Sequence, residues 1–126
     1  MPKDRILFGK NGETLAAEFL KKQGYKVLYR NYKTKLGEID IIAEDKDTLC
    51  FIEVKTRQSE KFGLPQEAVA WRKQAQVSKA ALIFLKEKKL WDKKARFDVV
   101  AVLSNDKVVE FDLIKDAFEL SGQYTF

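Results

Sequence analysis

The 126-residue chain contains no histidine and only one cysteine, Cys50. The lack of histidine excludes His-ligated zinc and histidine-based acid–base chemistry, and a single cysteine excludes an intramolecular disulfide and a cysteine-cluster metal site. Any metal ion must therefore be held by oxygen atoms, which favours Mg²⁺ or Mn²⁺. Cys50 falls on an apolar strand face, so we expect a buried, unreactive thiol.

Long apolar runs are also missing. No stretch approaches the roughly 20 apolar residues needed to span a bilayer, and the first ten residues, MPKDRILFGK, lack the apolar segment of a signal peptide. We therefore expect a cytoplasmic protein that does not enter a membrane. The length predicts one domain over residues 1–126. The net charge of +5 and the pI of about 9.2 are a modest basic excess that suits a polyanionic partner.

The stretch from 37 to 57, GEIDIIAEDKDTLCFIEVKTR, is the most informative part of the chain. Two segments rich in β-branched and apolar residues, 39–43 and 49–54, flank a polar turn, so we expect a β-hairpin. With the turn centred between Lys46 and Asp47, the predicted pairing sets three pairs of residues opposite each other: Ile41 with Ile52, Asp40 with Glu53, and Glu38 with Lys55.

One face of this hairpin is entirely apolar, so we expect it to pack in the core. Its members are Ile39, Ile41, Ala43, Cys50, Ile52 and Val54. The other face is apolar near the turn and charged at its far end, where it carries Glu38, Asp40, Glu53 and Lys55. The charged end is therefore the part of the hairpin that calls for a chemical explanation.

Two carboxylates that face each other across a hairpin destabilise it, so Asp40 and Glu53 need a partner. A divalent cation between them is one such partner, and Lys55, two residues after Glu53, could reach the same ligand. This set suits phosphodiester hydrolysis, because a metal ion activates water and neutralises phosphate charge, while a lysine positions the water or stabilises the developing charge. The alternative is an ordinary hairpin with solvated acids and a surface Lys–Glu pair.

The first predicted helix runs from Asp4 to Lys22. Glu13 lies three and four residues before Ala16 and Ala17, which places its side chain on the buried side of this helix. A carboxylate on that side needs a partner. Glu13 is therefore a candidate third acid for the metal site, the alternative being a pair with a buried arginine or lysine.

A series of short motifs occurs in order along nearly the whole chain: Gly9-x3-Glu13, Gly24-Tyr25, Arg30-Asn31, Gly37-Glu38-Ile39-Asp40, Phe51-Ile52-Glu53-Val54-Lys55-Thr56-Arg57, Gly63-x-Pro65 and Arg96-Phe97-Asp98. Asp40 followed by Glu53-Val54-Lys55 resembles the PD-(D/E)xK nuclease signature, although Ile39 stands where that signature has proline. Together the motifs resemble the YraN-like family of small bacterial proteins, related to archaeal Holliday-junction resolvases.

The resemblance implies a restriction-endonuclease-like fold and a nuclease that uses Mg²⁺ or Mn²⁺ to cut DNA, with branched DNA as one candidate substrate. It assigns metal binding to Asp40 and Glu53, with the main-chain carbonyl of Val54 and the carboxylate of Glu13 as further ligands. Lys55 would position the attacking water. The first alternative is a non-catalytic nucleic-acid-binding or accessory protein on the same fold, and the second is a protein–protein module with a basic face.

The remaining segments predict an α/β protein. We expect strands at 25–32, 97–103 and 107–113, a long helix at 65–89 and a short helix at 114–120. Together with the first helix and the hairpin, this order predicts a mixed central β-sheet flanked by helices. Asp98 lies inside an apolar run, so we expect it to pair with Arg96 or with a helix residue.

Basic residues around the acidic cluster are candidates for contacts to nucleic-acid phosphates. They are Lys73, Arg57, Lys35 and Lys79. The alternative is a solvated basic surface. Two symmetric cuts in a junction would need two copies of the chain, so a homodimer is one expected partner arrangement, with Trp71 and Trp91 as candidate interface residues.

Overall fold

The computed structural model describes residues 10–57, 71–104 and 108–120. The predicted helix starts at Asp4 and Pro65, and the Gly9 and Gly63-x-Pro65 parts of the motif series, lie outside these ranges. Within them the chain forms two helices and five strands in the order α2 (Lys10–Lys22), β1 (Lys26–Lys33), β2 (Glu38–Asp45), β3 (Thr48–Arg57), α3 (Trp71–Lys88), β4 (Lys94–Ser104) and β5 (Val109–Phe118).

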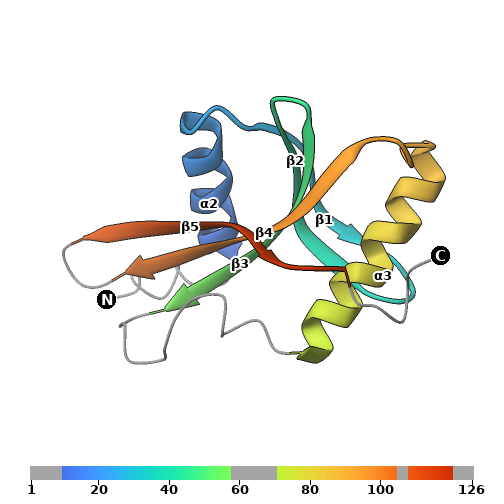
Figure 1. Ribbon diagram of the computed structural model, residues 1–126. Helices are drawn as coiled ribbons and strands as arrows, with labels where there is room; N and C mark the ends of the chain where they lie inside the picture. Colours follow the sequence, from blue (N-terminus) through green and yellow to red (C-terminus); the bar gives the residue numbers. More distant parts are fainter. Residues whose placement is uncertain (1–9, 58–70, 105–107, 121–126) are drawn as a thin grey trace.

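The five strands form one sheet in the order β1-β2-β3-β4-β5. Neighbouring strands are antiparallel except β3 and β4, which are parallel and are separated in sequence by α3. Figure 1 shows α2 and α3 on opposite sides of this sheet. The predicted α/β class, a mixed central β-sheet flanked by helices, is therefore confirmed. None of the described helices is long and apolar enough to cross a membrane.

Each helix covers its own apolar cluster. The α2 side buries Ala16, Ala17 and Leu20 of the helix against Ile41, Ala43, Cys50, Ile52, Val100 and Val102 of the sheet. The α3 side buries Val77, Ala80, Ala81 and Phe84 against Ile39, Ile42, Leu49, Phe51 and Phe97. Because both faces of the central strands are covered, these strands are apolar on both faces near the hairpin turn.

The predicted hairpin register is confirmed from the turn to the pair of Ile41 with Ile52. The described pairing does not extend to the predicted pairs of Asp40 with Glu53 and Glu38 with Lys55. Ile39 was wrongly placed on the face of Ile41: it packs in the α3 cluster instead. The described pairs of β2 with β3 end at Ile41 and Ile52, so strict alternation no longer determines which way Ile39 points.

The short helix predicted at 114–120 is wrong. Strand β5 continues to Phe118, and its last described pair joins Phe118 to Phe97 on β4. The register of β5 shifts before that pair, and Asp116 there has a positive φ of 54°. This irregularity breaks the alternation in sequence that would have identified a continuous strand. By contrast, Gly24, with φ of 96°, follows α2 as expected for a helix end.

Candidate metal-binding active site

Asp40 lies where β2 and β3 separate. One residue beyond the last regular pair, its Oδ2 accepts a hydrogen bond from the main-chain N–H of Val54 at 2.9 Å. The Asp40 carboxylate thus replaces the backbone carbonyl that would otherwise accept a hydrogen bond from this N–H. It lies between the two strands, and only 7% of the residue is exposed. A buried carboxylate oriented by a main-chain donor is a preorganised ligand.

Glu53 is the second buried acid, with 3% of the residue exposed. Its Oε2 has no hydrogen-bond partner in the described part of the chain, and the ammonium of Lys73 lies 3.7 Å away, beyond hydrogen-bond distance. Burial, followed by the hydrogen bond and the negative charge of Asp40, raises the pKa of Glu53 to about 9, although the charges of Lys73 and Lys55 act to lower it. The two carboxylates therefore repel each other strongly when both are ionised.

Glu13 approaches this pair from the first turn of α2. The side chain is half-buried, and burial and the charge of Asp40 raise its pKa, with Arg30 opposing the shift. Glu13 therefore lies partly on the inner side of α2. Three acids from α2, β2 and β3 are electrostatically coupled at one end of the sheet.

The donor chemistry of this cluster fits a hard divalent cation. An unpartnered buried carboxylate oxygen is costly, and a cation beside the Oε2 of Glu53 would satisfy it while relieving its repulsion with Asp40. Within the described ranges no three acidic or cysteine side chains form a ready-made metal cluster. Mg²⁺ is consistent with that arrangement, because it is usually held by one or two carboxylates and keeps several waters.

A polar groove of about 410 Å³ adjoins the acids. It is lined by Lys33, Thr34, Lys35, Leu36, Gly37, Glu38, Lys73 and Gln76. Two of the four predicted phosphate-binding residues, Lys35 and Lys73, therefore come together. Among described residues, Arg57 and Lys79 are not in this lining: Arg57 ends β3 and Lys79 lies further along α3.

Several features of the site were not predicted. Lys73 was expected only as a phosphate contact, yet its ammonium lies beside Glu53. Lys33 and Gln76 were not singled out as site residues, although both line the groove. Their spacing from Glu38 and Lys73 could have suggested them, since Lys33 begins the turn that leads to Glu38 and Gln76 lies one helical turn beyond Lys73.

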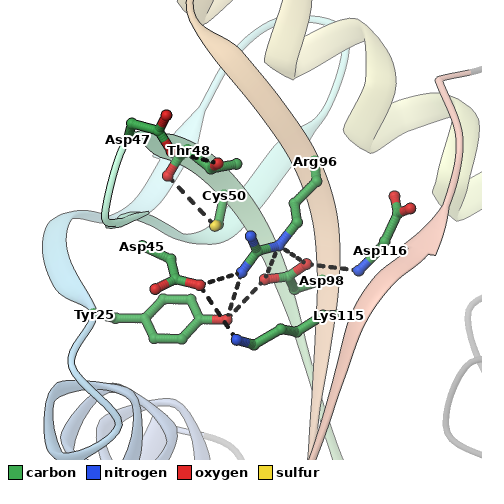
Figure 2. A network of polar contacts seen from close by, with 9 residues as sticks. All are labelled: Tyr25, Asp45, Asp47, Thr48, Cys50, Arg96, Asp98, Lys115 and Asp116. Carbon is green, nitrogen blue, oxygen red and sulfur yellow. Dashed lines mark hydrogen bonds and ion pairs between the residues drawn. The ribbon is translucent and has the colours of Figure 1, made fainter.

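A second polar network lies away from the acids (Figure 2). Arg96 donates from Nε to Asp98 Oδ1 at 2.9 Å and from Nη2 to Asp45 Oδ2 at 2.8 Å, and Lys115 also donates to Asp45. The predicted pairing of Asp98 with Arg96 is confirmed. Tyr25, which joins this network, follows the C-terminal end of α2, whereas Glu13 is in its first turn. The network is therefore a structural element at the opposite end of α2.

Cys50 is also part of the protein interior. Its residue is 0% exposed, and burial raises the pKa of its thiol to about 12. The burial expected from the sequence is confirmed, and the raised pKa disfavours the reactive thiolate at neutral pH.

The mixed sheet, the two described helices that cover it and the buried acids at the strand separation define an α/β protein with a candidate metal site at one end of its sheet. The chain belongs to the uncharacterised protein family UPF0102, whose model matches residues 12–102. The YraN-like resemblance is thereby confirmed.

Relatives in this family match the chain over almost its whole length. A UPF0102 protein of Syntrophus aciditrophicus is 52% identical over 113 residues, which cover 90% of this chain and 89% of the relative. A UPF0102 protein of Geotalea daltonii is 52% identical over 119 residues, which cover 94% of each chain. The crystal structure of SSO0001 is 19% identical with a TM-score of 0.33, and the match covers 85% of this chain and 49% of that one. A likeness this weak carries no conclusion about function.

Proposed function

We propose that this protein is a metal-dependent nuclease that hydrolyses phosphodiester bonds of DNA. The observation that carries the proposal is the buried pair of Asp40 and Glu53, in which one Glu53 oxygen has no hydrogen-bond partner among the described residues. Two adjacent buried acids cost stability unless something neutralises them. A bound Mg²⁺ or Mn²⁺ would neutralise them and give them a chemical role.

Asp40 and Glu53 would be the side-chain ligands of that ion. In an extended strand the N–H and C=O of one residue point to the same side, so the carbonyl of Val54 is directed toward Asp40 together with the N–H that Asp40 accepts. This favours Val54 as a main-chain ligand. Glu13, coupled to Asp40 by charge, would act directly or through a water. The ion supplies charge neutralisation at the phosphate and a water of lowered pKa.

Lys55 would position the attacking water or stabilise negative charge that develops on the phosphate. It follows Glu53 by two residues on β3, and its charge lowers the pKa of Glu53, which is consistent with a position beside the acids. Lys73 would add positive charge on the other side of Glu53. Glu38, on the groove, would orient Lys55 or a water.

The substrate proposed is DNA, with branched, Holliday-junction-like DNA as a specific candidate because of the resemblance to archaeal junction resolvases. Lys35, Lys73, Arg57 and Lys79 would contact its phosphates. Cutting both strands of a junction symmetrically would require a homodimer.

One observation favours a second candidate, a non-catalytic nucleic-acid-binding or accessory protein. Lys73 already supplies a positive charge 3.7 Å from Glu53, so a lysine could replace the metal ion as the neutralising partner. The two candidates differ in metal dependence, since the accessory protein would bind nucleic acid equally well with and without a divalent cation.

The test is cleavage of labelled linear, flapped and four-way-junction DNA in the presence of Mg²⁺, Mn²⁺ or EDTA. The variants are Asp40→Asn and Lys55→Ala, and Glu18→Gln is the matched control because Glu18 is exposed on α2. Metal-dependent cleavage that is lost in both variants and retained in the control supports the nuclease. Intact DNA binding by the wild type, without cleavage of any substrate, favours the accessory protein.

A further inference from the structure

The groove beside the acids is strongly basic for its size. Its charged lining consists of Lys33, Lys35 and Lys73 against the single carboxylate of Glu38. Lys33 and Lys35 are exposed. Leu36, which follows Lys35, is 54% exposed and adds an apolar surface to the same groove. Several ammonium groups around a polar hollow are suited to an anion that spreads its charge over oxygens, such as a phosphate diester.

The turn that carries two of these lysines is held in one conformation. The hydroxyl of Thr34 accepts hydrogen bonds from the N–H groups of Leu36 and Gly37, both at 3.1 Å, and donates to the carbonyl of Gly37 at 2.8 Å. The N–H of Thr34 donates to the same carbonyl at 2.8 Å. A turn tied at both ends presents its side chains from a preorganised backbone, which lowers the entropic cost of binding.

The same turn is also docked on α3. A Cβ atom at Gly37 would lie 2.4 Å from the main-chain oxygen of Gln76, so only glycine permits this approach. In Figure 1 the β1–β2 turn lies alongside α3. This docking therefore fixes the positions of Lys33 and Lys35 in the turn relative to Lys73 on the helix.

Two residues belong to both the groove and the acidic site. Lys73 lines the groove and lies 3.7 Å from Glu53, and Glu38 lines the groove while its charge raises the pKa of Glu13. The groove and the candidate metal site are thus neighbours along one continuous surface. A ligand that places one phosphate at the acids can therefore reach the groove with the next part of its own backbone.

We infer that this groove is a second phosphate subsite that holds the backbone of a polynucleotide strand beyond the phosphate positioned at Asp40 and Glu53. Lys33 and Lys35 bind a backbone phosphate there, and Lys73 lies between the two positions. This inference rests on the proposed function and refines its substrate class: the ligand is a strand held at two consecutive places, rather than an isolated phosphate ester.

The experiment measures binding without cleavage. Fluorescence anisotropy of labelled oligothymidylate DNA and oligouridylate RNA is recorded in EDTA over a range of salt concentrations. The wild type is compared with Lys33→Ala/Lys35→Ala, and the control is Lys21→Ala/Lys22→Ala, which removes the same charge from exposed positions at the end of α2 opposite Glu13. Circular dichroism checks that all three proteins are folded.

We expect the groove variant to lose affinity on the order of ten-fold for both DNA and RNA at moderate salt. The slope of affinity against salt should fall by about one for each phosphate contact removed. The control should change less than two-fold, roughly the effect of net charge alone. Amide NMR shifts induced by a short oligothymidylate should concentrate at 33–38 and 73–76.

Equal losses in the groove variant and the control would overturn the inference, because general charge would then explain binding. A loss confined to DNA or to RNA would also overturn it, because the sugar rather than the phosphate would be recognised. Neither result depends on cleavage, so a protein that binds as expected but never cuts refutes only the nuclease. Normal metal-dependent cleavage with an unchanged KM in the groove variant refutes only the subsite.

Discussion

The carboxylate of Asp98 accepts a hydrogen bond from the main-chain N–H of Asp116 at 2.9 Å, at the point where β5 leaves regular pairing with β4. Asp40 does the same for Val54 where β2 and β3 separate. In both places a buried aspartate replaces a backbone carbonyl as the acceptor. The two differ in their surroundings, because Asp98 is surrounded by donors whereas Asp40 lies beside another acid.

Asp98 is therefore expected to be a major contributor to stability. It is 0% exposed and also accepts hydrogen bonds from Arg96 and from the hydroxyl of Tyr25 (Figure 2). Asp98→Asn should lower the free energy of unfolding by about 3 kcal/mol, because it leaves Arg96 partly unpaired in a buried site. Tyr25→Phe should cost only about 1 kcal/mol, since it removes one neutral donor.

Urea unfolding followed by circular dichroism measures both variants of this network. Equal costs for Asp98→Asn and Tyr25→Phe would contradict the central position of Asp98. DNA binding and cleavage by folded Asp98→Asn protein should remain near wild type, because the network lies at the far end of α2 from Glu13.

Asp45 makes stability depend on pH. A hydrogen bond from Arg96, and then one from Lys115, lowers the pKa of Asp45 below its usual 3.8. Because the folded-state pKa is depressed, the stabilisation is fully present above about pH 4 and is lost as pH falls through the lowered value. Asp45→Asn should cost roughly 1–2 kcal/mol at pH 7, and this difference from wild type should shrink progressively below pH 3.8.

Chemical denaturation at several pH values tests the role of Asp45. The control is Asp47→Asn, which removes the same charge from an ion pair with Lys94 whose side chains are 74% and 72% exposed. Solvent screens that pair, so its loss should have a smaller effect. A difference between wild type and Asp45→Asn that stays constant with pH would show that the charge of Asp45 is not what stabilises the fold.

Much of the fold follows from local pattern. The hairpin register could be predicted because apolar residues on both sides of the turn align only when Ile41 faces Ile52. The extension of β5 to Phe118 could not, because it depends on a bulge whose free amide is taken by Asp98, 18 residues away. Ile39 was misplaced for the same kind of reason, since strand separation interrupts the alternation.

The candidate metal site could be predicted to a similar extent. Asp40 and Glu53 could be picked out because two acids that face each other across a hairpin need a partner. Glu13 could be picked out because it is an acid on the buried side of a helix. The position of Lys73 could not be derived, because it depends on how α3 docks, and that docking depends on contact between Gly37 and the main chain of Gln76. Helix periodicity identifies a basic face but does not say which other element the face meets.

The Asp40–Glu53 pair should lower the stability of the metal-free protein and should be required for binding the metal ion. Without a metal ion the pKa of Glu53 is about 9, so its carboxyl group must take up a proton when the protein folds at neutral pH. Glu53→Gln removes this cost, so it should stabilise the fold by about 1 kcal/mol and raise the melting temperature by a few degrees. The same variant should lose the further rise that Mn²⁺ or Mg²⁺ gives the wild type, because the ion stabilises only the state that binds it. Thermal unfolding with and without metal, together with calorimetric Mn²⁺ titration, measures both effects.

Glu18→Gln is again the appropriate comparison, since Glu18 is an exposed acid on α2. It should change neither the metal-free melting temperature nor the metal-induced rise. If the Glu53→Gln protein retains the full metal-induced rise in melting temperature, the ion binds at another site.

Lys55 should matter for catalysis and not for metal binding. If it positions water or stabilises developing charge, Lys55→Ala should lower kcat on the order of 10² to 10³-fold, while Mn²⁺ affinity measured by calorimetry falls little or even rises, because a positive charge beside Glu53 has been removed. Single-turnover cleavage separates the chemical step from substrate binding. Loss of metal affinity parallel to the loss of cleavage would instead make Lys55 a residue that merely maintains the acidic site.

Gly37 should be far less replaceable than Gly24. A Cβ at Gly37 would lie 2.4 Å from the main-chain oxygen of Gln76, and a helix backbone cannot yield without moving α3, so Gly37→Ala should lower the free energy of unfolding by about 1–3 kcal/mol. Gly24 has a positive φ, but a Cβ added there would meet no atom within 4 Å, so Gly24→Ala should cost only the backbone strain, about 1 kcal/mol.

Urea unfolding ranks the two glycine variants, and anisotropy with oligothymidylate in EDTA distinguishes what they disturb. Folded Gly37→Ala protein should bind DNA more weakly than wild type, because the turn with Lys33 and Lys35 is pushed away from Lys73. Gly24→Ala, at the other end of α2 from Glu13, should bind normally. Equal stability costs in the two variants, with DNA binding unaffected in both, would show that the contact between Gly37 and Gln76 is loose and that the turn does not depend on α3 for its position.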